Sequence, residues 1–433
     1  MPRLTLRYIP KDVALPRQVW MLMIGQTLSS FGNGVILPFN AIYLHLVRGI
    51  PIAIVGVVIA AVAGGALVMT MVGGPLVDIL GSQTMVFVGL GLQACGMLMF
   101  ADAINPVIAV TAALVVGAGN GIFYPASTTL LAGLTAPSER SAAASIQYAG
   151  INLGIGLGAV SAGAVVAIGR PSTFVAMYLL DAATFLGYGA LLWLGGMRPR
   201  RPRQHGGRSS TSGAPQESTA SYRQVWLNRP FIAVLVFNTL TVMLGYSQLD
   251  AAVPLYAKAF LGVPNSAIGL LFAANTAAIV FLQIPVTRRL RGHRRHRVLT
   301  LLAGLWAVAW LFGAAASYSF GLQAAVLLGF CFVTFALGEC ALAGTLAPLA
   351  MDLAPPSSRG RHMAALSMTW SVGGLVGPAL AGLLLASSFH QAFWPLLTVG
   401  SVLLGVLASA MGAVLPAAAD LPGSQPPGAR QTA

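Results

Sequence analysis

The chain has 433 residues, of which 57% are hydrophobic and 8% are charged, and its mean hydropathy is +0.80. Soluble domains carry about 25% charged residues, so this composition excludes a soluble globular protein and indicates a chain that crosses a membrane many times. The net charge is +14. Because the basic segments lack interleaved aromatic residues for base stacking, nucleic-acid binding is not expected.

Twelve apolar stretches, each long enough to cross a bilayer, follow one another along the chain. They do not alternate between apolar and polar residues, and a lone span must satisfy its own backbone hydrogen bonds, so each is predicted to be an α-helix. The expected fold class is an all-α polytopic membrane protein with two pseudo-symmetric six-helix bundles. The predicted spans are residues 18–46, 53–77, 84–101, 106–134, 142–168, 173–195, 230–257, 266–287, 298–317, 322–351, 363–387 and 392–415.

The basic residues predict the orientation of these spans. If the N-terminus lies inside, every Lys and Arg except Arg48, Arg170 and Lys258 falls in an inside segment. This asymmetry follows the positive-inside rule and predicts that both termini are cytoplasmic. The preference for Arg over Lys is typical of a bacterial gene of high GC content, so we expect a bacterial inner membrane and contact with anionic lipid.

Polar segments divide the chain into five parts. We expect a cytoplasmic N-terminal segment at 1–17, a first bundle at 18–196, a flexible basic linker at 197–229, a second bundle at 230–415 and a disordered cytoplasmic tail at 416–433. The other loops are short, which leaves no room for a soluble catalytic domain. No histidine pairs with a carboxylate inside a predicted span, so an enzyme is not expected.

The two predicted bundles repeat one another. Sliding the chain by 219 positions places Gly154 and Gly158 on Gly373 and Gly377 without a gap. Two membrane-embedded near-copies are typical of a transporter.

A parallel repeat of six spans plus six, joined by a long basic loop, resembles the major facilitator superfamily over about residues 17–415. Gly74, Asp78 and Gly81 stand where that superfamily has a tight loop motif between spans two and three, although its basic residues are replaced here. The resemblance implies that this loop helps to gate the inner side, with Arg140 as a substitute partner for Asp78.

On span eleven, Gly373, Gly377 and Pro378 are similar to the glycine and proline motif of antiporters in this superfamily. In the superfamily that motif is diagnostic on span five, where this chain has Gly154 and Gly158 without the proline. This difference weakens the antiporter interpretation. Close helix packing is the alternative role for all these residues.

Two acids inside predicted spans are candidates for proton coupling, since a carboxylate at the bilayer centre costs about 2.5 to 3.5 kcal/mol on insertion scales and is retained for a reason. Glu339 lies near mid-depth of span ten, and Asp250 lies in the outer third of span seven. A proton-coupled carrier needs a carboxyl that binds and releases a proton. The alternative for Glu339 is a structural acid that locks span ten to its neighbours. The alternative for Asp250 is an acid at the membrane interface that water solvates.

The repeat offset aligns Glu339 with Asn120 of span four, so both would face one central cavity if the bundles pack pseudo-symmetrically. The resemblance implies that spans one, four, five, seven, eight, ten and eleven line this cavity. Amides with few fixed charges suit an amphipathic or weakly charged organic solute, and the alternative for each residue is a packing role. The candidate cavity residues are Gln26, Asn33, Asn120, Tyr124, Gln147, Asn152, Asn238, Asn275 and Trp370.

We therefore expect a secondary active transporter that works by alternating access, in which proton uptake drives efflux of an amphipathic drug or metabolite, as in multidrug resistance antiporters. An importer of a sugar, peptide or other nutrient is the first alternative, and a non-transporting sensor or membrane enzyme is the second. The absence of a P-loop pattern argues against an ATP-driven pump. We expect no cofactor and no metal, and as partners only the substrate, protons and membrane lipid; by analogy with the superfamily, a monomer is expected.

Overall fold

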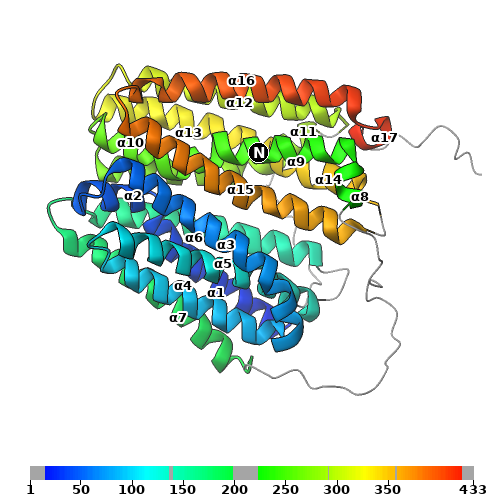
Figure 1. Cartoon of the computed structure of the whole chain (residues 1–433), viewed down its shortest axis with the longest axis horizontal. Coiled ribbons are helices and arrows are strands. Elements are labelled where there is room, and N and C mark those ends of the chain that lie inside the picture. The colour runs from blue at the N-terminus through cyan, green and yellow to red at the C-terminus, as the bar shows by residue number, and fades with distance from the viewer. Residues whose placement is uncertain (1–14, 136–139, 198–222, 291, 356–357, 422–433) are drawn as a thin grey trace, which may run out of the picture. The chain divides into compact units, whose positions relative to one another are not determined.

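The computed structural model describes residues 15–135, 140–197, 223–290, 292–355 and 358–421, and nearly all of them are helical (Figure 1). Within these ranges, eleven helical stretches are long and apolar enough to cross a membrane. They correspond to the second to twelfth predicted spans. The prediction of an all-α polytopic membrane protein is confirmed, with one difference in the first span.

The first predicted span does not form one continuous helix. Its helix α1 (Arg17–Ile36) contains polar residues such as Gln26, and it ends just before Pro38. A turn separates it from α2 (Asn40–Ile42) and the π-helix η1 (Tyr43–Val47). Because proline has no N–H to continue the helical hydrogen bonds, the chain breaks the helix at this position.

The chain forms two compact units, and they do not divide at the linker alone. In α3 (Ile52–Leu80), Gly56 has no side chain, and the backbone of Gly382 packs directly against it. Through this contact the start of α3 belongs to the second unit, although it lies within the predicted first bundle, 18–196. Of the described residues, the first unit comprises 15–37, 64–135 and 140–197, and the second comprises 38–63, 223–290, 292–355 and 358–421.

The first unit packs long helices around α1. Helix α1 contacts α6 and α7, and α4 contacts α5 and α7. Helix α5 begins directly after Asn105, whose side-chain oxygen accepts a hydrogen bond from the Ile108 N–H at 3.0 Å, a regular N-cap. The helices are α4 (Ser82–Ala101), α5 (Pro106–Leu134), α6 (Arg140–Val165) and α7 (Pro171–Leu194).

The second unit has an aromatic core. Trp306 stacks on Phe335 with ring centroids 4.2 Å apart, and both side chains are fully buried. Helices α12 and α16 run side by side, α12 also contacts α13, and α13 contacts α11 (Figure 1). The helices are α9 (Arg229–Thr241), α10 (Val253–Ala259), α11 (Asn265–Leu290), α12 (Arg295–Ala316), α13 (Leu322–Ala343), α14 (Leu346–Leu353), α15 (Arg359–Ala386) and α16 (Phe393–Val414).

The glycines of the repeat lie at equivalent helix crossings in the two units. Gly154 and Gly158 of α6 pack on α1, where a Cβ on either would overlap a main-chain oxygen. Gly373 and Gly377 of α15 pack in the same way on span seven, and Pro378 is buried beside them. Small residues therefore let these backbones meet, and an antiporter role for them stays a prediction.

Two short helices lie in segments that are predicted to be flexible or disordered. Helix α8 (Arg223–Leu227) forms at the end of the predicted linker, and α17 (Ala417–Asp420) forms at the start of the predicted tail. These are corrections to the two segments. The rest of both segments, and residues 1–14, lie outside the described residues.

Candidate functional site

The best-defined polar site in the second unit is centred on Glu339 of α13. Its side chain is half-buried, and its Oε2 accepts a hydrogen bond of 2.8 Å from the amide Nδ2 of Asn275 on α11. Asn275 is buried, and the same nitrogen lies 3.4 Å from the carbonyl oxygen of Phe332. The structure thus brings together two predicted site residues that are 64 positions apart.

Span seven approaches this carboxyl in an irregular form. Between α9 and α10 it consists of two π-helices, η2 (Val242–Tyr246) and η3 (Gln248–Ala252). Pro254 follows them; it has no N–H to donate, and its ring clashes with the carbonyl four residues before it, which disfavours a regular α-helix at η3. Sequence reasoning missed the π-helices, and Pro254 is the signal that could have suggested them; π-turns are frequent at functional sites.

The π-helices carry two further groups that interact with Glu339. Tyr246 and Asp250 both lie close enough to interact with its carboxylate. Asp250 is half-buried, like Glu339. We call Glu339, Asp250, Asn275 and Tyr246 the carboxyl cluster; it joins spans seven, eight and ten.

Aromatic rings extend the carboxyl cluster toward span eleven. The ring of Tyr246 lies 4.8 Å from that of Trp370, 5.6 Å from Trp306 and 5.9 Å from Phe335. Trp306 and Phe335 are buried, whereas Trp370 is 46% exposed. The cluster therefore has an exposed tryptophan beside Tyr246.

Two further predicted cavity residues are buried among the helices of their units, and their role in a cavity stays a prediction. Asn238 of α9 is fully buried, and its Nδ2 donates to Thr369 Oγ1 at 2.6 Å. Gln26 of α1 is also buried. In this structure Asn238 joins α9 to α15, and it presents no accessible surface to a solute.

The remaining candidates lie in the first unit. Tyr124 is 57% exposed, Asn33 is exposed, and Asn120 and Gln147 are half-buried. Asn152 is half-buried and donates to the Tyr148 carbonyl of its own helix at 2.9 Å. Their access to a common cavity with Glu339 stays a prediction.

The predicted gating loop is shorter than expected. Helix α3 continues through Gly74 and Asp78 to Leu80, and Gly81 alone separates it from α4. Gly81 has φ +83°, a conformation that favours glycine, so the tight turn is present. The side chains of Asp78 and Arg140 lie outside the described part of the chain, and their pairing stays a prediction.

The described residues include no group of three or more His, Cys, Asp or Glu side chains that could hold a metal ion. Around the carboxyl cluster, the donors and acceptors are two carboxyls, an amide and a phenol. These groups can exchange protons, and they can bind a solute by hydrogen bonds to its polar groups.

Comparison with known proteins places the chain in a family. The profile of the Major Facilitator Superfamily matches residues 22–336 and 235–432. The uncharacterized MFS-type transporter YqjV of Bacillus subtilis is 25% identical over 370 residues, which cover 84% of this chain and 85% of that protein. The multidrug resistance protein MdtH of Aeromonas salmonicida is 25% identical over 395 residues, which cover 88% of this chain and 92% of that protein.

A solved structure has the same fold. A crystal structure of a variant of the nucleoside transporter NupG superposes with a TM-score of 0.72 and 14% identity, covering 91% of this chain and 99% of that one. With the helical architecture, the internal repeat and a profile that spans most of the sequence, the chain belongs to the Major Facilitator Superfamily and is a secondary transporter.

Proposed function

We propose that this transporter is a proton-coupled exporter that moves amphipathic small organic molecules by alternating access across a bacterial inner membrane, with both termini cytoplasmic. Glu339 is the group that takes up and releases the proton. The observation that carries the proposal is the position of the Glu339 carboxyl, half-buried within a span and held by Asn275 of a neighbouring helix.

The surroundings of Glu339 support proton exchange. Acids inside membrane spans are rare and mark proton relays and ion pathways. Asn275 holds one carboxylate oxygen, and the nearby Asp250 repels Glu339 when both are ionised. Uptake of a proton by one carboxylate, or binding of a cation beside the pair, therefore relieves this repulsion.

The chemistry of the substrate follows from the surface next to the carboxyl cluster. The exposed Trp370 and the ring of Tyr246 can stack on an aromatic or aliphatic body, while the carboxyls can attract a positive group. The relative from Aeromonas salmonicida is named a multidrug resistance protein, and this similarity also favours efflux of such molecules.

An importer of a nutrient is the second candidate, because the fold is shared with a nucleoside transporter. The fold is compatible with either direction, and the two candidates differ in the direction of the proton gradient that drives accumulation. Direction is therefore part of the test.

The test is flux of a fluorescent amphipathic cation in proteoliposomes of known protein orientation, with an imposed proton gradient. The natural protein, Glu339→Gln and Glu339→Asp are compared. We expect gradient-driven accumulation on the side from which protons leave, loss of accumulation in Glu339→Gln, and partial recovery in Glu339→Asp, which restores a titratable carboxyl.

Three results would count against the proposal. Absence of gradient-dependent flux for a broad panel of dyes would reject multidrug efflux. Accumulation in the direction of proton flow would identify an importer. Equal flux in the natural protein and Glu339→Gln would remove Glu339 as the coupling group, and Asp250→Asn would then be examined.

A further inference from the structure

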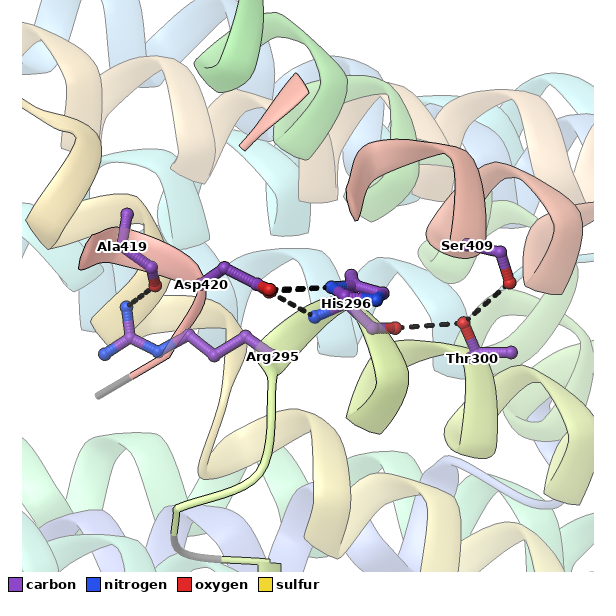
Figure 2. A network of polar contacts seen from close by, with 6 residues as sticks. All are labelled: Arg295, His296, Thr300, Ser409, Ala419 and Asp420. Carbon is purple, nitrogen blue, oxygen red and sulfur yellow. Dashed lines mark hydrogen bonds and ion pairs between the residues drawn. The ribbon is translucent and has the colours of Figure 1, made fainter. Parts of the chain in front are cut away.

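The short helix α17 provides the N-terminal cap of α12, which lies far from it in sequence. The carboxylate of Asp420 accepts a hydrogen bond from the backbone N–H of His296 at 3.0 Å and lies 2.8 Å and 2.9 Å from the ring Nδ1 of the same residue (Figure 2). Arg294, the N-cap residue of α12, makes no capping bond of its own. Asp420 therefore caps α12 from 124 residues away, where a negative charge is favoured.

Arg295, the first residue of α12, binds two other elements at the same time. Its Nη1 donates to the carbonyl oxygen of Ala419 at 2.8 Å and forms an ion pair with Asp352 Oδ2 at 2.7 Å. Arg295 is 8% exposed. Because a buried guanidinium is costly without its partners, these two contacts depend on one another.

Asp352 belongs to α14, which continues span ten beyond the helix that carries Glu339. The other side of the α14 terminus is held by Asn228, whose Nδ2 donates to the Leu353 carbonyl at 3.0 Å. An open depression lies between the end of α14 and α17, and it is bordered by Asp352, Leu353 and Ala419. Arg295 bridges the two elements, through its ion pair with Asp352 of α14 and its hydrogen bond to Ala419 of α17.

We propose that Pro416–Asp420, the C-terminal strap, fixes the start of α12 and the end of α14 in one arrangement, and that Arg295 transmits the restraint to α14. The strap is thus a conformational device of the second unit. The proposal does not depend on the direction or substrate of transport, since it concerns local opening of two helix ends.

Hydrogen exchange of the full-length protein in lipid nanodiscs tests this proposal. A chain that stops after Leu415 lacks the strap, and a chain that stops after Leu421 keeps every contact described above and is the matched control. Removing a helix cap opens a helix end by roughly five- to tenfold. We expect exchange to rise by this factor in residues 296–299 and also in 346–353 of the shorter chain, with no change in the control.

A second variant guards against misfolding of the shorter chain. Asp420→Ala removes the cap and so loosens α17, which carries the Ala419 carbonyl that Arg295 binds. We expect faster exchange in the same two segments with an unchanged helical circular dichroism spectrum. Unchanged exchange in both variants would overturn the proposal. A rise confined to residues 296–299 would also overturn it, because α17 would then cap α12 without restraining α14.

Discussion

Asp181 of the first unit and Glu339 of the second unit both lie inside spans, and the two acids have different surroundings. Asp181 of α7 is fully buried, its Oδ1 accepts a hydrogen bond from Thr184 of the same helix at 3.2 Å, and Oδ2 has no partner among the described residues. Glu339 is half-buried and is held by Asn275 of another helix. The comparison indicates that access and a partner on a second helix, more than presence in a span, mark an acid suited to proton exchange.

The largest expected effect separates the two acids directly. Glu339→Gln should lower substrate-driven proton movement by about 10²-fold or more, the scale of removing a proton-transfer group. Asp181→Asn, which keeps the shape of a buried side chain, should stay within about twofold, since no proton exchange is assigned to it. A pH indicator inside proteoliposomes measures both variants, and a comparable loss in Asp181→Asn would contradict the comparison.

The partner of Glu339 provides the next test. Asn275→Leu removes a hydrogen bond to a charged group, which is worth about 1.5 to 3 kcal/mol, so we expect transport to fall by about tenfold or more. Gln283→Leu is the control, because this amide of α11 binds Thr287 and the Cys340 carbonyl. Initial rates of dye transport at equal protein amounts check the pair; equal rates in the two variants would show that Asn275 does not support Glu339.

The exposed aromatic surface should have a smaller effect. Trp370→Ala should raise the KM for an aromatic cation about three- to tenfold, which corresponds to one lost aromatic contact of about 0.5 to 1.5 kcal/mol, while kcat changes little. Trp193→Ala replaces a similarly exposed tryptophan on α7 of the first unit and should leave KM unchanged. A KM effect of the same size in both variants would remove Trp370 from the substrate site.

The packing around Asp181 can be tested by measuring the thermal stability of two glycine variants. A Cβ on Gly32 of α1 would overlap the Asp181 carboxyl and the Thr184 hydroxyl, whereas a Cβ on Gly91 of α4 would meet no atom. Gly32→Ala should therefore cost about 1 to 3 kcal/mol. Gly91→Ala should be neutral or slightly stabilising, because alanine favours the helix. Thermal unfolding in detergent compares them, and equal midpoints would show that α1 and α7 adjust to the added methyl group.

Much of the fold is predictable because it depends on local composition. The span predicted at 106–134 forms as Pro106–Leu134, where Asn105 and Pro106 are regular start signals. The repeat offset also directs attention to Glu339, since an acid aligned with an amide is visible in the sequence alone.

The rest depends on contacts between distant residues. Neither the bond from Asn275 to Glu339 nor the burial of Asn238 against Thr369 follows from helical periodicity, because each depends on which faces of two helices meet. The composition of the tail predicts disorder, but four of its residues form α17. Ala419 and Asp420 of this helix bind the start of α12. The π-helices of span seven are likewise a feature that hydropathy does not register.

The strap also has a consequence for how the protein is made. Its capping carboxylate follows His296 by 124 residues, and ribosomes add about 5 to 20 residues per second, so the start of α12 waits roughly 6 to 25 s for Asp420 to be synthesised. During that interval Arg295 lacks the Ala419 acceptor, and until Asp352 is made it lacks both of its acceptors. Final closure of this end of the second unit is therefore a late step of biogenesis, which follows insertion of span nine into the membrane.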